Sequence, residues 1–342
     1  MSAAVEYKST ILFHGNCIDG FTSAFIANSA LSTKGPVQMF PISPNQERTW
    51  PLGQRLRDTH VFMVDISVPQ SYRDKWMKEG ALSIVCIDHH ASSVEHWPQG
   101  ACPINTESCA ALQTHAYFYP GVAPPGWLLA VDRIDRWTDD ITDADRCIRE
   151  ILSIIAHKTD HEDVREAMTL MMKFAHDMND AEAVQRYLVH GKQVLEQKDL
   201  QLLRLMERGT ILTITAEIAV QWSLPETWVG RNVFIMDNTS ITIDSTEAAY
   251  LMFKYSEKTD IFINYRKKAY HGKPFPQYIF SARARRSIGL DITQGTMLKG
   301  HPQSAGASVV QKPGMCIPFI MHFVNQQPVN QAVEMSDAAA AP

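Results

Sequence analysis

The chain has 342 residues, of which 45% are hydrophobic and 20% are charged. This length exceeds one ordinary core and the composition is that of a globular protein, so we expect two domains. The formal net charge of −5 argues against broad coating of nucleic acid. It remains compatible with a short oligonucleotide held in a locally positive cleft.

No part of the sequence predicts export or membrane insertion. No apolar run approaches the length of a membrane span, and residues 1–8 lack the apolar core of a signal peptide. The six cysteines form no Cys-x-x-Cys pair, which argues against a structural zinc knuckle. Cys86 lies inside an apolar run and is most simply a core residue. We therefore expect a cytoplasmic protein with reduced cysteines and no membrane partner.

Residues 9–155 alternate short apolar runs with segments of helical spacing. Helices are expected near residues 21–27 and 72–77. The runs with the length of buried strands are Thr10–Phe13, His60–Val64 and Ser83–Ile87. Alternation of strands and helices predicts an α/β domain with a parallel sheet.

Each of the three predicted strands ends in side chains that can bind a metal ion. In chain order these are His14, Cys17 and Asp19, then Asp65, then Asp88, His89 and His90. Because open α/β sheets build their sites at the carboxyl ends of their strands, these side chains should meet at one rim. Imidazoles and carboxylates are the ligand set of a divalent-metal centre. The pattern predicts a metallohydrolase, although Asp65 alone could instead cap the following helix.

The order of these elements resembles the DHH phosphoesterase family, which includes RecJ exonucleases, nanoRNA and cyclic-dinucleotide phosphodiesterases, exopolyphosphatases and family II pyrophosphatases. The resemblance implies a further acidic ligand downstream, and residues 127–137 offer Asp132 and Asp135. Asp132 is preferred because it is closest to the apolar run, and Asp135 is the alternative. The aspartate that does not bind metal is expected to pair with Arg133 or Arg136.

Residues 156–208 have a different character, charged and helical with few glycines or prolines. Val164, Ala167, Met168, Met171 and Met172 form an apolar stripe, which favours helix packing over a ligand site. We expect a helical connector here, between the catalytic domain at 9–155 and a smaller α/β domain at 209–326. Residues 327–342 are expected to be a disordered tail.

From residue 209 the sequence again has the character of strands. Residues 210–215 and 218–222 alternate as a hairpin would. Further strands are expected at residues 232–236, 260–265 and 277–281.

Two motifs in this region extend the resemblance to about residues 10–310. The segment from Gly300 to Ala307 is similar to the GGGHPxAAGA signature of the DHH-associated substrate domain, and Ser281-Ala282-Arg283 resembles the Ser-x-Arg strand before it. The resemblance implies that Arg283, Gly300 and His301 bind the phosphate or nucleotide end of a substrate. The usual glycine run is reduced to Gly300, so the backbone that holds the phosphate is expected to be reshaped.

The resemblance implies two Mn²⁺ ions bridged by Asp65, with Mg²⁺, Co²⁺ or Zn²⁺ as alternatives. One ion would be held by His14 and Cys17, and the other by Asp19, His89 and Asp132. Position 17 carries Asp in many members of the family. A thiolate there favours softer ions such as Zn²⁺, or Cys17 takes no part in binding.

The implied reaction is hydrolysis of phosphodiester bonds in short oligonucleotides or cyclic and linear dinucleotides by a two-metal-activated hydroxide. His90 would contact the scissile phosphate, and Asp88 would orient an imidazole that binds metal. The alternatives are an exopolyphosphatase or pyrophosphatase, and a nucleotide-binding protein with impaired catalysis. A homodimer is left open.

Overall fold

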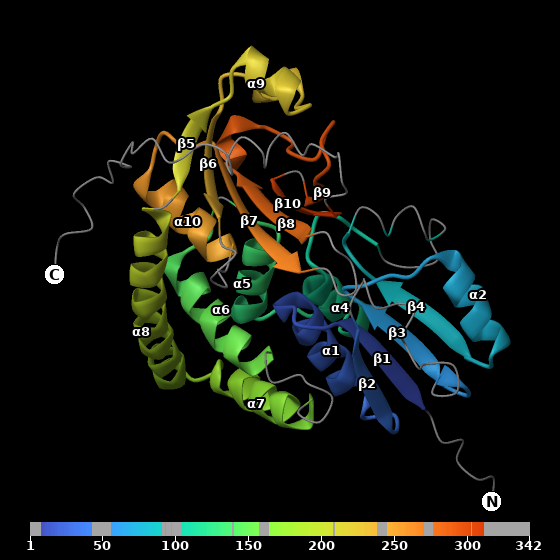
Figure 1. Ribbon diagram of the computed structural model, residues 1–342. Helices are drawn as coiled ribbons and strands as arrows, with labels where there is room; N and C mark the ends of the chain where they lie inside the picture. Colours follow the sequence, from blue (N-terminus) through green and yellow to red (C-terminus); the bar gives the residue numbers. More distant parts are fainter. Residues whose placement is uncertain are drawn as a thin grey trace, which may run out of the picture. The chain divides into compact units, whose positions relative to one another are not determined.

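The computed structural model describes residues 8–42, 56–90, 93, 97, 104–138, 140–156, 164–207, 209–237, 245–269, 276–301 and 303–310. Its contacts divide the chain into two compact units, Met1–Leu195 and Glu196–Pro342 (Figure 1). The tail predicted at 327–342 lies outside the described residues. The domain limits expected from the sequence remain a prediction.

The first unit has an α/β architecture. Its elements are β1 (Ser9–His14), α1 (Ile18–Leu31), β2 (Val37–Ile42), β3 (His60–Val64), α2 (Gln70–Lys78), β4 (Ser83–Ile87), α4 (Ala110–Phe118), α5 (Gly126–Asp135), α6 (Asp143–Ala156), α7 (Val164–Asp177) and α8 (Ala181–Met206), which continues into the second unit. The three predicted strands are confirmed as β1, β3 and β4. The two predicted helices are confirmed as α1 and α2.

A four-stranded sheet of order β2-β1-β3-β4 forms the centre of this unit, and all of its strand pairs are parallel. The strand β2 was not expected from the sequence. It lies at the edge of the sheet and contains Pro41, which cannot donate a hydrogen bond and is tolerated at an edge. A proline inside a short apolar run conceals such a strand in the sequence.

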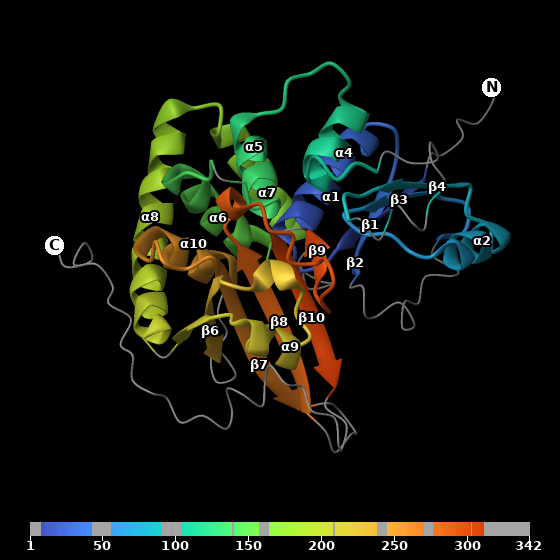
Figure 2. The ribbon, with the colours of Figure 1, turned by 90° about the horizontal axis from the view of Figure 1, so that it is seen from above.

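Both faces of the sheet are buried, because side chains alternate along a strand and both sets are apolar. Phe13 and Val64 belong to a core shared with α1 and α4 to α7. Leu12 and Met63 face the opposite core, which includes Trp76 of α2. Figure 2 shows α1 and α4 side by side with α2 away from them. Continuous apolar runs were therefore a correct sign of a parallel sheet.

The helical stripe in α7 is confirmed with one exception. Val164, Ala167, Met168 and Met171 are buried, whereas Met172 is 54% exposed. The sequence continues the stripe for one residue beyond the face that the helix buries.

The second unit contains a mixed sheet. Its elements are β5 (Thr210–Thr213), α9 (Ala216–Gln221), η3 (Glu226–Trp228), β6 (Asn232–Asp237), α10 (Ser245–Tyr255), β7 (Ile261–Ala269), β8 (Pro276–Ala284), η4 (Arg286–Ile288), β9 (Lys299–His301) and β10 (Ser304–Val310). The sheet order is β5-β6-β7-β8-β10-β9, in which β6 and β7 are parallel and the other described pairs are antiparallel. The α/β fold class is confirmed.

The hairpin predicted at 210–222 is wrong in its second half. Residues 216–221 form α9, and the hydroxyl of Thr215 caps it by accepting a hydrogen bond from the Ile218 amide at 3.2 Å. Five alternating residues also fit one helical turn and a half, and a threonine before them supplies the start signal. The N-cap decides between the two readings here.

Candidate metal centre

The carboxyl edge of the parallel sheet brings the predicted side chains together. Phe13 is paired with Val64, and Val64 with Ile87, so the residues that follow each strand stand in adjacent positions. The Asp65 amide donates to the Ile87 carbonyl at 2.9 Å, which holds this rim together.

The backbone at the rim is tightly constrained. Asp65 has a left-handed φ of 59°, a conformation that costs free energy in a non-glycine residue and is concentrated at functional sites. Gly20 of α1 packs directly on the end of β1, because a Cβ atom there would lie 2.4 Å from the His14 carbonyl oxygen. Glycine at this position lets the helix approach the strand and places the neighbouring Asp19 in the site.

Asp65 lies between two imidazoles. Its Oδ2 is 3.3 Å from Nδ1 of His14, and its Oδ1 is 3.2 Å from Nε2 of His89. The carboxylate is 1% exposed. Each oxygen therefore faces a different group of side chains, the arrangement expected of a carboxylate that bridges two cations.

His89 directs one nitrogen at three carboxylates. Its Nε2 lies 3.2 Å from Asp65 Oδ1, 3.4 Å from Asp135 Oδ2 and 3.5 Å from Asp19 Oδ2. Burial by itself would lower the pKa of His89, but the contact with Asp65 and the charges of Asp135 and Asp19 raise that pKa to about 11. Three carboxylates around one nitrogen form an environment that demands positive charge.

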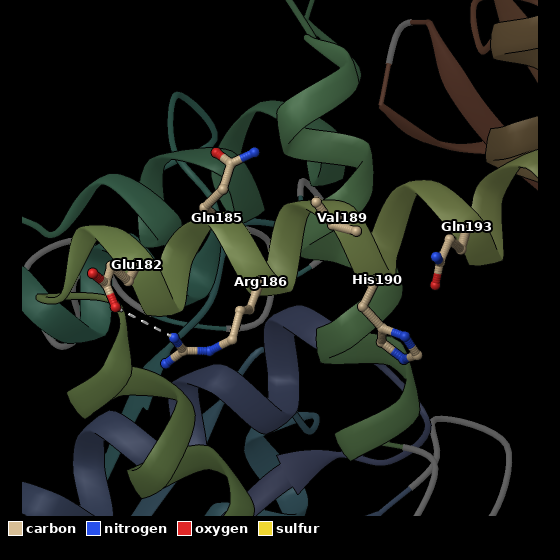
Figure 3. A pocket seen from close by; sticks show the side chains of 6 residues that line it. All are labelled: Glu182, Gln185, Arg186, Val189, His190 and Gln193. Carbon is tan, nitrogen blue, oxygen red and sulfur yellow. Dashed lines mark ion pairs between the residues drawn. The ribbon is translucent and has the colours of Figure 1, made fainter.

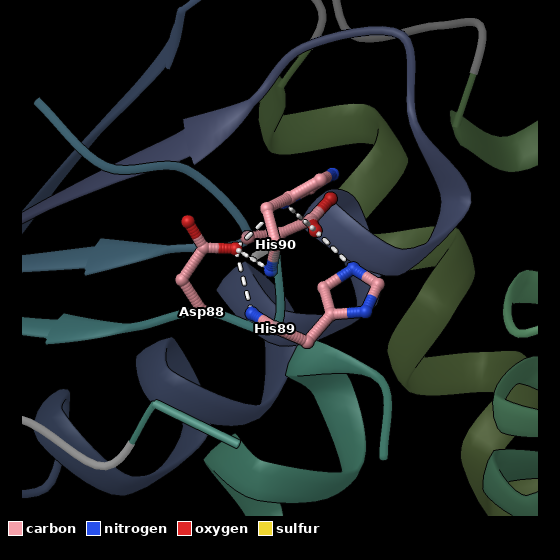
Figure 4. Close-up of side chains that lie close together, drawn as sticks. Asp88, His89 and His90 are labelled. Carbon is pink, nitrogen blue, oxygen red and sulfur yellow. Dashed lines mark hydrogen bonds and ion pairs between the residues drawn. The ribbon is translucent and has the colours of Figure 1, made fainter. Parts of the chain in front are cut away.

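Asp88 organises the turn that carries the two histidines (Figure 4). Its Oδ1 accepts hydrogen bonds from the His89 amide at 2.7 Å and from Nδ1 of His90 at 2.7 Å, and its Oδ2 accepts one from Ser93. The ring of His89 points away from this carboxylate. Asp88 thus orients His90, and together with Asp65 it outweighs the effect of burial and raises the pKa of His90 to about 9.

Asp132 and Asp135 have different surroundings, although both come from α5. Asp132 accepts hydrogen bonds from the Cys109 amide at 2.7 Å and from Arg136 at 2.9 and 2.6 Å. Asp135 joins Asp19 and His89 in a group whose ligand atoms all lie within 4.8 Å of one another. Within the described residues, the groups able to hold a metal ion do not include Asp132. The geometry favours the alternative, Asp135, over the residue preferred from the sequence.

The N-terminus of α4 explains the role of Asp132 and also positions Asp19. Asp19 accepts hydrogen bonds from the Ala110 and Ala111 amides at 2.9 and 2.7 Å, and Asp132 accepts the one from Cys109. Two carboxylates from other elements thereby satisfy the first amides of the helix and interact favourably with its dipole. The sequence did not indicate this contact, because α4 is about 90 residues from Asp19.

Cys17 lies in a second group, with His14 and Asp65, whose ligand atoms are again within 4.8 Å of one another. It is the N-cap residue of α1 and is partly exposed. Burial of the thiol, followed by the charges of Asp65 and Asp135, raises the pKa of Cys17 well above its ordinary value. A cation in the group would reverse this effect, since a coordinating thiol is deprotonated by its metal.

The pKa values of the two buried carboxylates Asp19 and Asp65 shift in opposite directions. Burial, together with the neighbouring carboxylates, raises the pKa of Asp19. Burial also acts to raise the pKa of Asp65, but its contacts with His14 and His89 outweigh it and hold that pKa well below the usual value. Asp65 is therefore the carboxylate most strongly held in its ionised, metal-binding form.

The donor set fits divalent cations. Oδ2 of Asp65 and Oδ2 of Asp135 are buried, and each faces an imidazole nitrogen, of His14 at 3.3 Å and of His89 at 3.4 Å. Buried carboxylates need a compensating positive charge, which either a protonated imidazole or a bound cation supplies. Imidazole and carboxylate ligands at these spacings can hold two ions, one beside each oxygen of Asp65.

The residues expected to bind substrate lie in the second unit. Arg283 donates to Ser281 Oγ at 3.1 Å, to the Ala282 carbonyl at 2.9 Å and to Thr246 Oγ1 at 3.1 Å. In the sheet register Ser304 is paired with Arg283 on one side and with His301 on the other. Gly300 is paired with Ala305, so the glycine motif forms the β9–β10 hairpin.

A shallow hollow lies on the surface of α8 (Figure 3). It is lined by Glu182, Gln185, Arg186, Val189, His190 and Gln193. Glu182 and Arg186 form an ion pair of 3.9 Å between exposed side chains. None of the metal-capable groups in the described part of the chain includes a residue of this helix.

Comparison with known proteins finds similarity only among solved structures. No family model and no curated protein matches the sequence. A pGpG-specific phosphodiesterase, PggH from Vibrio cholerae, is similar with a TM-score of 0.46 and 11% identity, covering 89% of this chain and 94% of that one. An exopolyphosphatase-related protein from Bacteroides fragilis has a TM-score of 0.45 and 10% identity, covering 93% and 91%.

RecJ from Thermus thermophilus, in complex with Mn²⁺, is similar with a TM-score of 0.44 and 13% identity, over 88% of this chain and 49% of RecJ. With TM-scores below 0.5, these similarities decide neither activity nor substrate.

Among the described helices, none is both long and apolar enough to cross a membrane.

Proposed function

We propose that this chain is a divalent-metal-dependent phosphoesterase of the DHH type. The observation that carries the proposal is the buried Asp65 carboxylate, whose two oxygens face His14 and His89 in two separate groups of ligands. Two adjacent cation positions bridged by a carboxylate are typical of phosphatases and nucleases, which stabilise the attacking and the leaving oxygens together.

The ligand assignment follows two of the three groups of metal-capable side chains, and the third, of Asp65, Asp88, His89 and His90, shares Asp65 with the one and His89 with the other. His14, Cys17 and Asp65 form the first position. Asp19, His89 and Asp135 form the second, where the other oxygen of Asp65 completes the set. Asp135 takes the place that the sequence suggested for Asp132, because Asp132 is occupied by Arg136 and the Cys109 amide.

The bound cations would lower the pKa of a water and neutralise charge on the phosphoryl oxygens. The protein's own contribution is orientation. Asp88 holds Nδ1 of His90, which leaves Nε2 on the opposite side of the ring to meet the scissile phosphate. Against the effect of burial, Asp88 and Asp65 raise the pKa of His90 to about 9 in the metal-free site. As an imidazolium, His90 would stabilise phosphoryl charge and donate a proton to the leaving oxygen.

We propose short oligonucleotides or linear and cyclic dinucleotides as substrates. Support comes from the sequence resemblance of residues 281–283 and 300–307 to the motifs of the DHH-associated substrate domain, and from the guanidinium of Arg283, which suits a phosphate. The side chains of Tyr278 and Trp137 are only 5% and 7% exposed, so neither offers an aromatic face on which a nucleotide base could stack.

The test is a substrate panel assayed with Mn²⁺, consisting of pApA, short RNA, cyclic dinucleotides and tripolyphosphate, with the products identified. We expect hydrolysis of a dinucleotide or short RNA by the wild type and its loss in Asp65→Ala and His89→Ala. Hydrolysis of tripolyphosphate alone would refute the proposed nucleotide substrates and make polyphosphate the substrate class. Binding of nucleotide without turnover of any substrate would make the chain a binding protein, and unchanged activity in either variant would refute the metal assignment.

A further inference from the structure

The two metal positions differ in the chemistry of their ligand atoms. The first group offers one imidazole nitrogen, one thiol sulfur and one carboxylate oxygen, from His14, Cys17 and Asp65. The second offers an imidazole nitrogen and two carboxylate oxygens, from Asp19, His89 and Asp135. Asp65 adds a further oxygen to the second group through its Oδ1. Sulfur is therefore confined to one side of the bridging carboxylate.

Cys17 is placed as a ligand rather than as a core residue. Cys86 and Cys109 are fully buried, whereas Cys17 is partly exposed at the first turn of α1. The carboxylate that faces it provides further support for a cation, because Asp65 Oδ2 is buried and lies 3.3 Å from His14 Nδ1, so that imidazole, thiol and carboxylate ligand atoms converge on one point. His14, also partly exposed, leaves one side of the group open.

We infer that the His14–Cys17–Asp65 position is a thiolate site selective for a thiophilic ion of the Zn²⁺ class, and that the Asp19–His89–Asp135 position takes a harder ion of the Mn²⁺ class. The centre would then hold two different metals. This inference rests on the proposed metal centre and adds the identity of its ions.

General coordination chemistry supports this division. Zn²⁺ binds cysteine, histidine and carboxylate, and catalytic zinc sites combine three protein ligands with one open position. Carboxylates suit Mn²⁺, whereas thiolates select softer ions. Binding through the sulfur displaces the thiol proton to solvent, and the thiolate remains as the ligand.

The first test uses Co²⁺, because a thiolate bound to Co²⁺ gives a sulfur-to-metal charge-transfer absorption in the near ultraviolet. The chelator-treated full chain is titrated with Co²⁺. We expect the band in the wild type and in Cys147→Ala, the control that removes a thiol outside the described metal groups. We expect the band to vanish in Cys17→Ser, which should fold because serine is a favourable N-cap residue.

The second test measures metal content after equilibration with one equivalent of Zn²⁺ per chain and a large excess of Mn²⁺, because Zn²⁺ binds most sites more tightly than Mn²⁺. We expect close to one Zn²⁺ and one Mn²⁺ per wild-type chain, and a lower Zn²⁺ content in Cys17→Asp. A lower affinity for Zn²⁺ by at least about 10-fold is expected in Cys17→Ser, while the affinity for Mn²⁺ stays the same.

A Co²⁺ spectrum and a Zn²⁺ to Mn²⁺ ratio that are the same in the wild type and the Cys17 variants would overturn the inference. The proposed function would survive that result if Asp65→Ala still abolished both metal binding and hydrolysis. If the Cys17-dependent band appeared but no phosphoester were hydrolysed, the thiolate site would stand and the proposed reaction would fall.

Discussion

The contrast between Asp132 and Asp135 provides the sharpest test of the site. Both aspartates lie on α5, three residues apart, and each can be replaced by the isosteric asparagine. We expect Asp132→Asn to destabilise the fold and leave cation binding intact. We expect Asp135→Asn to weaken cation binding and to leave the stability of the fold nearly unchanged.

The expected magnitudes follow from the contacts. Breaking one side of a buried ion pair costs about 3–5 kcal/mol. The Arg136 side chain is 23% exposed, which favours the lower end, about 3 kcal/mol, for Asp132→Asn. For a unit of 195 residues the unfolding entropy is about 0.4 kcal/mol/K, so Tm should fall by about 7 °C.

Asp135→Asn should change the stability of the metal-free protein by less than about 1 kcal/mol. Burial raises the pKa of Asp135, with Asp65 adding to that effect and His89 opposing it. The fold therefore disfavours the ionised carboxylate, and a neutral amide removes that cost. Cation affinity should fall by about 100-fold or more, since loss of even an outer-shell partner costs about 10- to 100-fold.

Thermal unfolding in chelator and calorimetric titration with Mn²⁺ measure the two effects separately. The assignment is refuted if Asp132→Asn weakens Mn²⁺ binding while Asp135→Asn does not. Equal loss of binding in both variants, with unchanged Tm for Asp132→Asn, would place both carboxylates on metal.

Three further outcomes are expected. Gly20→Ala should lower Tm and weaken Mn²⁺ binding, because its Cβ would lie 2.4 Å from the His14 carbonyl oxygen of β1. The control Gly126→Ala has open space around the added Cβ and should leave Tm and Mn²⁺ binding unchanged. Equal melting curves for the two variants would contradict the close packing at Gly20. Burial acts to raise the pKa of Asp145, but contacts with Arg133 and Thr142 outweigh it and lower that pKa. The ionised Asp145 therefore stabilises the fold above about pH 4, and this stabilisation is lost as the pH falls further. In Asp145→Asn, the free energy of unfolding measured with urea should depend less on pH in this acidic range. Arg283→Ala should raise KM at least about 10-fold with Mn²⁺ affinity unchanged, and an unchanged KM would exclude it from substrate binding.

Much of the first unit could be predicted because its signals are local. The apolar runs before His14, Asp65 and Asp88 reveal buried strands, and strand periodicity determines where each polar side chain emerges. Local signals failed where two structures share a pattern. Residues 218–222 alternate like a strand but begin a capped helix, and Pro41 conceals the edge strand β2.

The sequence by itself determined that the candidate ligands lie at or just after the ends of buried strands, since the position of a strand end depends only on neighbouring residues. These ligands are His14, Cys17, Asp19, Asp65 and the Asp88–His90 triplet. The tertiary structure decided how they divide into groups. It placed the N-terminus of α4 against Asp19 and Asp132, which removed Asp132 from the cluster and left Asp135 beside His89. That choice depends on contacts between residues far apart in sequence, and no periodicity or spacing encodes it. The same packing put Cys17 beside His14 and Asp65, so that only one of the two proposed metal positions includes a sulfur atom.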